Sequence, residues 1–129
     1  MVELYPEDVK VVFKNFPLRN HAQAMPAARA ALAAHAQGKF WSYHDQLFAN
    51  AKQLGPELYE KIATDLKLDL EKFNRERNGR PSFEQVAADF RLGQSAGVRG
   101  TPALYVNGLL LEQRSPDVLR QMIEDELSR

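Results

Sequence analysis

Three histidines, His21, His35 and His44, are the candidates for acid–base or metal chemistry in this sequence. No two of them have the His-x-x-x-His spacing that presents two imidazoles to a zinc ion from one helix face. His44 is followed by Asp45, whose carboxylate could orient an imidazole, but adjacent residues on a helix do not face each other. We therefore expect the histidines to form surface or interhelical hydrogen bonds, and we predict no metal site.

Covalent catalysis has no nucleophile of a familiar kind in this chain. The sequence contains no cysteine, which excludes disulfides, thiolate ligands and a cysteine nucleophile within these residues. It has no Gly-x-Ser-x-Gly element, and its glycines match neither a phosphate loop nor a dinucleotide fingerprint. The charged run at residues 75–80 is interpreted as a solvated helix face, with an anion-binding patch as the alternative. We predict no catalytic residue and no cofactor.

Length and charge limit the partners. The 129 residues suffice for one domain, and 17 basic residues balance 17 acidic ones. Without excess charge, the chain has no electrostatic footprint for nucleic acid or an anionic membrane. No apolar run approaches the roughly 20 residues of a membrane span. Glu3, Pro6 and Glu7 do not fit a signal peptide, so the sequence as written predicts a cytoplasmic product.

The most informative stretch is residues 97–111. Tyr105 and Val106 favour a strand, as does the apolar run at residues 109–111, and Asn107-Gly108 between them predicts a type I′ hairpin turn. The residue before a proline is extended, so we expect a loop at 97–102 that leads into the first strand. The local sequence alone favours an ordinary loop with a trans proline, since most X-Pro bonds are trans.

The rest of the chain reads as one strand and several helices. Residues 9–13 (VKVVF) are rich in β-branched residues and carry apolar side chains on both faces of an extended chain, which predicts a buried strand. The alanine-rich segment at residues 21–37 predicts a helix that begins near Met25, and a second helix is expected over residues 39–50. Further helices are expected to begin at 55–56, to run from Asp69 to about 79, to run from after residues 80–82 to about 96, and to begin at Ser115. An aromatic stripe of Phe40, Tyr43 and Leu47, flanked by Trp41 and Phe48, is expected to belong to the core.

Several stretches resemble one family. The loop and hairpin at 97–108 resemble the DsbA-like branch of the thioredoxin superfamily, and so do residues 13–18, 27–31, 37–41 and 43–48. These stretches follow the family's order and span most of the chain. The resemblance implies an α/β fold: an incomplete thioredoxin-like fold with an inserted helical domain, in the order strand, helices, β-hairpin, helix. Residues 1–129 would form a single truncated domain, with the helical insertion at about 21–80.

The resemblance also implies a binding site. Thr101-Pro102 would be the family's cis-proline loop, which reverses the expectation of a trans bond from the local sequence. Arg99, Gly100, Thr101 and Pro102 would then bind an extended peptide or unfolded protein substrate by strand addition.

One feature of the family has no counterpart here. In the family, a strand and a Cys-x-x-Cys helix precede the strand that begins near Val9, and the helix N-terminus makes the thiolate reactive. Without a thiol the chain supports no thiol–disulfide exchange, so we expect it to be redox-inactive as given. The complete protein would be a disulfide oxidoreductase or isomerase, exported if a longer precursor exists. The alternatives are a redox-inactive module that binds peptides or a partner, and a glutathione-dependent enzyme of related fold.

The missing strand would lie at the centre of the sheet. Its absence would leave unpaired strand edges and an uncovered apolar face. We therefore expect self-association through exposed sheet edges, or a shift of residues 9–13 to lie beside residues 101–106.

Overall fold

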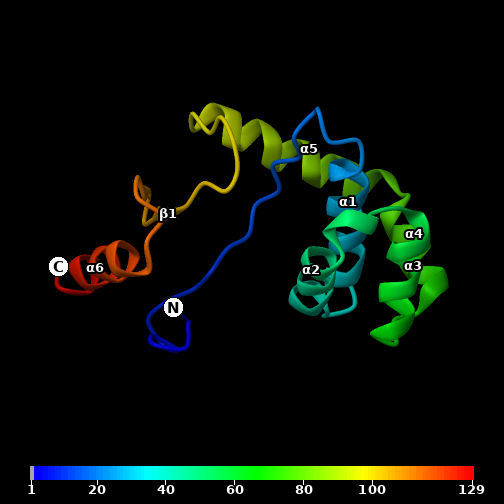
Figure 1. Ribbon diagram of the computed structural model, residues 1–129, viewed down its shortest axis with the longest axis horizontal. Coiled ribbons are helices and arrows are strands. Elements are labelled where there is room, and N and C mark those ends of the chain that lie inside the picture. Colours follow the sequence, from blue (N-terminus) through cyan, green and yellow to red (C-terminus); the bar gives the residue numbers. More distant parts are fainter. Residues whose placement is uncertain (1) are drawn as a thin grey trace. The chain divides into compact units, whose positions relative to one another are not determined.

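The computed structural model describes residues 2–129 (Figure 1). Helices account for most of the regular structure, and a single short hairpin supplies the strands. In chain order the elements are α1 (Ala24–His35), α2 (Phe40–Ala49), the 3₁₀ turn η1 (Ala51–Gln53), α3 (Pro56–Asp65), α4 (Leu70–Arg77), α5 (Arg80–Ser95), β1 (Tyr105–Val106), β2 (Leu109–Leu110) and α6 (Pro116–Leu127).

The chain divides into two compact units. The helical unit, Asn15–Gly97, is continuous in sequence and contains α1 to α5. The hairpin unit joins Met1–Lys14 with Val98–Arg129 and contains β1, β2 and α6.

The helical unit is built around α1, which contacts α2, α3, α4 and α5. The alanine side chains of α1 are small, so large side chains of the neighbouring helices pack close to its backbone. Tyr43, Tyr59 and Phe73 are fully buried against it. The buried cluster consists of Ala30, Ala31, Ala33, Ala34, Tyr43, Leu58, Tyr59, Ile62, Ala63 and Phe73.

The aromatic stripe of α2 is only partly a core feature. Tyr43 is buried, and Phe40 and Leu47 pack against the core cluster, as expected. Trp41 and Phe48, however, are 47% and 70% exposed. These two side chains lie beside the buried stripe, because a ten-residue helix packed on one side turns its other faces to solvent.

Helix ends follow the capping residues that the sequence predicts. The Asp69 carboxylate accepts a hydrogen bond from the Lys72 amide at the start of α4 (3.1 Å). The Ser115 hydroxyl accepts one from the Val118 amide at the start of α6 (3.3 Å). After α5, Gly97 has a φ of +87°, a conformation in which glycine lacks the steric penalty of other residues.

The hairpin has the predicted turn. β1 and β2 are antiparallel, with Val106 opposite Leu109 and Tyr105 opposite Leu110. Asn107 and Gly108 have φ values of +48° and +84°, so both central positions are left-handed, as a type I′ turn requires.

The strand predicted at residues 9–13 is not formed, and that prediction is wrong. Val11 and Val12 are 52% and 61% exposed, and residues 9–16 have no regular secondary structure. The sheet of the described residues consists of β1 and β2 alone, so residues 9–13 do not pair beside residues 101–106 either. A strand is stable only with a hydrogen-bonded neighbour, and residues 2–129 supply none for this segment.

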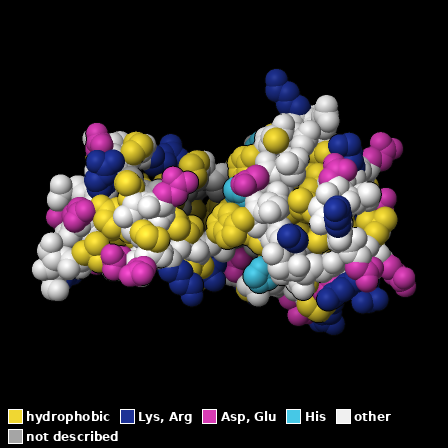
Figure 2. All heavy atoms as spheres, turned by 90° about the horizontal axis from the view of Figure 1, so that it is seen from below, with side chains coloured by type: hydrophobic (Ala, Val, Ile, Leu, Met, Phe, Trp, Pro, Cys, Tyr) yellow, Lys and Arg dark blue, Asp and Glu magenta, His cyan; other side chains and the backbone are white. Residues whose placement is uncertain are grey.

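Charged and hydrophobic side chains are interspersed over the surface that Figure 2 displays. Among the helices of residues 2–129, none combines the length and the apolar character needed to cross a membrane.

Candidate functional site

The residues predicted to bind peptide form an exposed loop in the hairpin unit. Arg99, Gly100, Thr101 and Pro102 are all solvent-exposed and lead directly towards β1. The Thr101–Pro102 peptide bond is cis. The loop therefore presents backbone and one guanidinium group to solvent.

The backbone that follows the loop has one paired and one unpaired edge. The Leu111 amide donates to the Leu104 carbonyl (2.8 Å), which extends the hairpin by one residue pair beyond the strands. In an antiparallel pair, backbone groups alternate in direction, so Leu104 and Val106 face β2 while Ala103 and Tyr105 face the other side. No strand among residues 2–129 pairs with that other side. It can accept an extended chain through main-chain hydrogen bonds.

A side chain that the sequence analysis did not single out holds this loop. The Arg114 guanidinium donates through Nη1 to the Pro102 carbonyl at 2.8 Å. The hairpin register indicates this contact in retrospect, because it places Pro102 across from residue 113, next to Arg114. Predicting it requires knowing how far the pairing extends beyond the two-residue strands.

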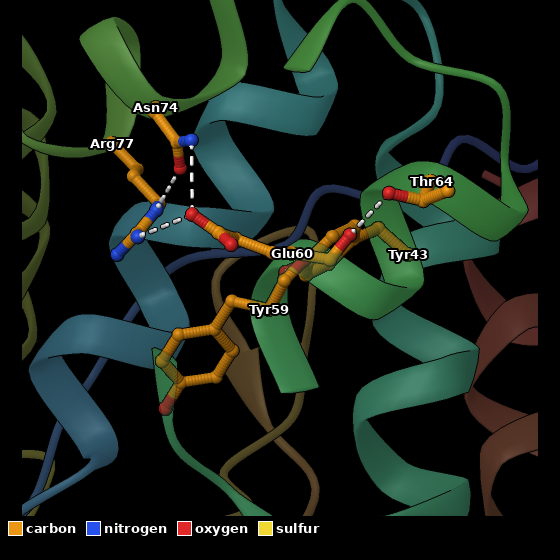
Figure 3. A network of polar contacts seen from close by, with 6 residues as sticks. All are labelled: Tyr43, Tyr59, Glu60, Thr64, Asn74 and Arg77. Atoms are coloured by element: carbon orange, nitrogen blue, oxygen red, sulfur yellow. Dashed lines mark hydrogen bonds and ion pairs between the residues drawn. The ribbon is translucent and has the colours of Figure 1, made fainter. Parts of the chain in front are cut away.

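The helical unit contains two buried tyrosines whose hydroxyls donate hydrogen bonds. Figure 3 shows both tyrosines among neighbouring polar side chains. The Tyr43 hydroxyl donates to the Tyr59 carbonyl (3.0 Å), and the Tyr59 hydroxyl donates to Gln23 Oε1 (2.8 Å). Burial raises the pKa of both tyrosines above the ordinary value of 10.0. Both phenols therefore remain neutral at physiological pH and act as structural donors.

Arg77, from the charged run at residues 75–80, belongs to the network of polar contacts in Figure 3. Arg77 is 14% exposed, lies 3.9 Å from Glu60, and donates through Nε to Asn74 Oδ1 (2.8 Å). Figure 3 shows Glu60 also accepting from Asn74, and the Thr64 hydroxyl donating to the Glu60 carbonyl. Arg80 pairs with Glu84 at 2.7 Å. These pairings favour a structural role for Arg77 and Arg80 over anion binding.

The histidines show one difference from expectation. His44 Nδ1 lies 3.1 Å from Asp45 Oδ1, although the sequence analysis expected adjacent helical side chains to point apart. The Asp45 side chain is 75% exposed and lies on the helix surface. The centroids of the His44 and Phe48 rings are 4.7 Å apart. The contact between His44 and Asp45 is a surface hydrogen bond. Among residues 2–129, no group of three potential ligands could hold a metal ion.

Two further polar side chains, Asp89 and Arg29, join segments of the helical unit, and their contacts were not predicted. Asp89 is 6% exposed and accepts from the Asn15 amide, Asn15 Nδ2 and Gln85 Nε2 at 2.9–3.1 Å. Arg29 donates to Ser82 Oγ (3.1 Å) and to the Gly79 carbonyl (2.8 Å). The sequence did contain a signal for the role of Asp89, because this residue lies on the same face of α5 as Val86. A carboxylate on a buried face requires hydrogen-bond donors.

Comparisons with known proteins identify the family and the fold of the chain. Residues 2–124 match the family described as "DSBA-like thioredoxin domain". A thioredoxin-like oxidoreductase from Silicibacter pomeroyi has a similar solved structure, with a TM-score of 0.71 and 26% identity over 91% of this chain and 67% of that chain. The thioredoxin-like fold implied by the sequence resemblance is therefore confirmed.

The curated relatives include proteins of different kinds. A "Na(+)/H(+) antiporter NhaA 3" from Salinispora tropica is 38% identical over 78% of this chain and 16% of its own length. A "Probable disulfide bond formation protein D" from Bacillus cereus is 30% identical over 94% of this chain and 59% of its own length. The chain thus spans about a sixth of the antiporter and less than two thirds of the Bacillus protein. By its match over nearly all residues, the chain belongs to the DsbA-like thioredoxin domain family.

Proposed function

We propose that this chain binds extended polypeptide for a DsbA-like thiol–disulfide oxidoreductase, and that the 129 residues by themselves perform no thiol–disulfide exchange. The observation that supports peptide binding is the 99–102 loop, which continues into the unpaired edge of β1. Redox silence follows from composition, because the sequence has no thiol to form a mixed disulfide.

In this proposal, Arg99 and Thr101 supply the contacts to the bound peptide. The backbone of Thr101 would pair with the peptide by strand addition, and Gly100 and Pro102 would shape the loop. Arg99 is exposed and has no ion-pair partner within residues 2–129, so its guanidinium is open to a ligand. Residues 21–80 would serve as a helical insertion of the single domain that spans residues 1–129.

Titration with a thiol-free extended polypeptide tests the site. S-carboxymethylated insulin B chain should bind the wild-type chain, and Arg99→Glu should weaken that binding at least fivefold, since reversal removes a charge-assisted contact. Arg91→Glu is the matched control, because Arg91 is an exposed arginine of α5 in the helical unit. Equal affinities for the three proteins would overturn the site assignment.

A second assay tests redox silence. In an insulin-reduction assay, the chain should give the rate of the blank without protein, and any clear turnover would contradict the proposal.

The intact mass of the protein from its native cells distinguishes an oxidoreductase or isomerase from a redox-inactive binding module. A mass well above 14.6 kDa with a Cys-x-x-Cys segment would support the oxidoreductase or isomerase. A mass near 14.6 kDa would favour a redox-inactive binding module.

We further propose that the chain self-associates through the exposed edges of its hairpin. The redox-active form would be exported from the cytoplasm, because disulfides persist in oxidising environments.

A further inference from the structure

The hairpin ends at a point where one side chain takes over the role of a backbone donor. The backbone ladder between the two strands reaches the Leu111–Leu104 hydrogen bond. The next carbonyl on the β2 side of the chain belongs to Pro102, two residues earlier. Its donor is the Arg114 guanidinium, at 2.8 Å. At this point the chain is already turning into α6, and the Ser115 amide donates to the Gln113 carbonyl (2.9 Å).

We propose that Arg114 is a positioning residue of the peptide-binding site. By holding the Pro102 carbonyl on the β2 side, the guanidinium fixes the planes of the peptide groups on either side of it. The backbone groups of Thr101 and Ala103 then remain on the opposite edge, where an extended peptide would pair. The benefit to peptide affinity rests on the proposed function, whereas the ordering of the loop does not.

The loop has little else to hold it. Arg99, Gly100, Thr101 and Pro102 are all exposed, so no core packing restrains them. Arg114 takes part in no ion pair among residues 2–129, and its guanidinium donates to the Pro102 carbonyl. Ordering a loop at the moment of binding lowers affinity, so a loop already fixed by Arg114 binds more tightly.

Peptide affinity gives the first measurement. Arg114→Ala should weaken binding of S-carboxymethylated insulin B chain about fivefold, the worth of one solvent-exposed, charge-assisted hydrogen bond. Arg114→Lys retains a positively charged donor and should recover part of the loss. Arg91→Ala, which removes an exposed arginine from the helical unit, should bind like the wild type. An unchanged affinity in Arg114→Ala would overturn the benefit to binding.

Backbone order gives a second measurement that needs no peptide. ¹⁵N relaxation should give the Thr101 and Ala103 amides order parameters of about 0.85 in the wild type and about 0.6 in Arg114→Ala. The Val106 and Leu109 amides, which lie in the hairpin, should be unchanged in both proteins. Unchanged values at Thr101 and Ala103, or an equal loss of order throughout the hairpin, would overturn the proposal. If the wild type binds no peptide but the loop still loosens, only the proposed function fails.

Discussion

Asp89 connects the N-terminal end of the helical unit to α5 through two hydrogen bonds accepted from Asn15, and it accepts a third from Gln85 within α5. Asp89→Ala leaves the backbone amide and Nδ2 of the buried Asn15 without their hydrogen-bond acceptor. We expect Asp89→Ala to lower the free energy of unfolding by about 2–3 kcal/mol, measured by urea denaturation. Asp65→Ala removes a carboxylate from an exposed i,i+4 pair with Lys61 and should cost less than about 0.5 kcal/mol. Equal losses in the two variants would contradict the structural role of Asp89.

The buried tyrosines make stability fall at alkaline pH. Burial raises the pKa of Tyr43 in the folded state above its ordinary value of 10.0. Above pH 10 the unfolded chain therefore releases a proton that the folded chain keeps, and the free energy of unfolding decreases as pH rises. Below pH 10 both states keep this proton, and the stabilisation is fully present.

Tyr43→Phe tests this linkage. The variant should lose about 1 kcal/mol at pH 7, because it lacks the hydrogen bond to the Tyr59 carbonyl. Between pH 10 and 11 its stability should decline less steeply than that of the wild type, as one titrating phenol is gone. Tyr105→Phe, at a 42% exposed position in β1, is the control and should lose less stability than Tyr43→Phe at pH 7. Parallel slopes for wild type and Tyr43→Phe would show that burial of Tyr43 does not contribute.

At the scale of elements, the hairpin depends on two residues with positive φ. Gly108→Ala places a Cβ at φ +84°, where a side chain is strained, although no other heavy atom lies near that position. We expect a loss of about 1 kcal/mol confined to the hairpin, seen as faster hydrogen exchange of the Leu109 and Leu111 amides. Gly55→Ala is the control, because Gly55 is extended and also has open space around it. Equal exchange in both variants would contradict a strained turn.

Elements with strong local signals were predictable, and those that depend on partners were not. The Asp69 and Ser115 caps and the Asn107-Gly108 turn act through neighbours in sequence, so their types and places are confirmed. The strand at residues 9–13 was wrong because strand formation requires another strand, which periodicity alone does not reveal.

The same division holds at the candidate site. Glycine and proline predicted a loop at residues 97–102, which the structure has, while the peptide-binding role of Arg99 to Pro102 rests on the family resemblance and stays a prediction. The Arg114 contact and the two contacts between Asp89 and Asn15 join residues that are 12 and 74 positions apart in sequence. Their partners follow from register and packing, which composition does not specify.

At the scale of the whole molecule, the two units differ in how well they bury apolar surface. The helical unit encloses a continuous core of ten residues. In the hairpin unit, Leu111 and Ile123 are the buried hydrophobic residues among those described, while Leu104, Tyr105, Leu109 and Leu110 are 42–50% exposed. An isolated two-stranded hairpin is marginally stable in water, so this unit gains from added apolar contacts.

If the hairpin unit is stabilised by added apolar contacts, the chain should self-associate. In sedimentation velocity, the wild-type chain should shift from monomer towards larger species as its concentration rises, because exposed apolar strands pair edge to edge. Leu109→Thr with Leu110→Thr keeps strand propensity while removing exposed apolar surface, and should move the transition to at least tenfold higher concentration. Phe48→Gln removes a 70% exposed ring from α2 and should leave the transition in place. A single monomeric species at every concentration, with cooperative melting, would mean that the hairpin unit is stable without a partner. In that case, the exposed edge of β1 would be available to peptides alone.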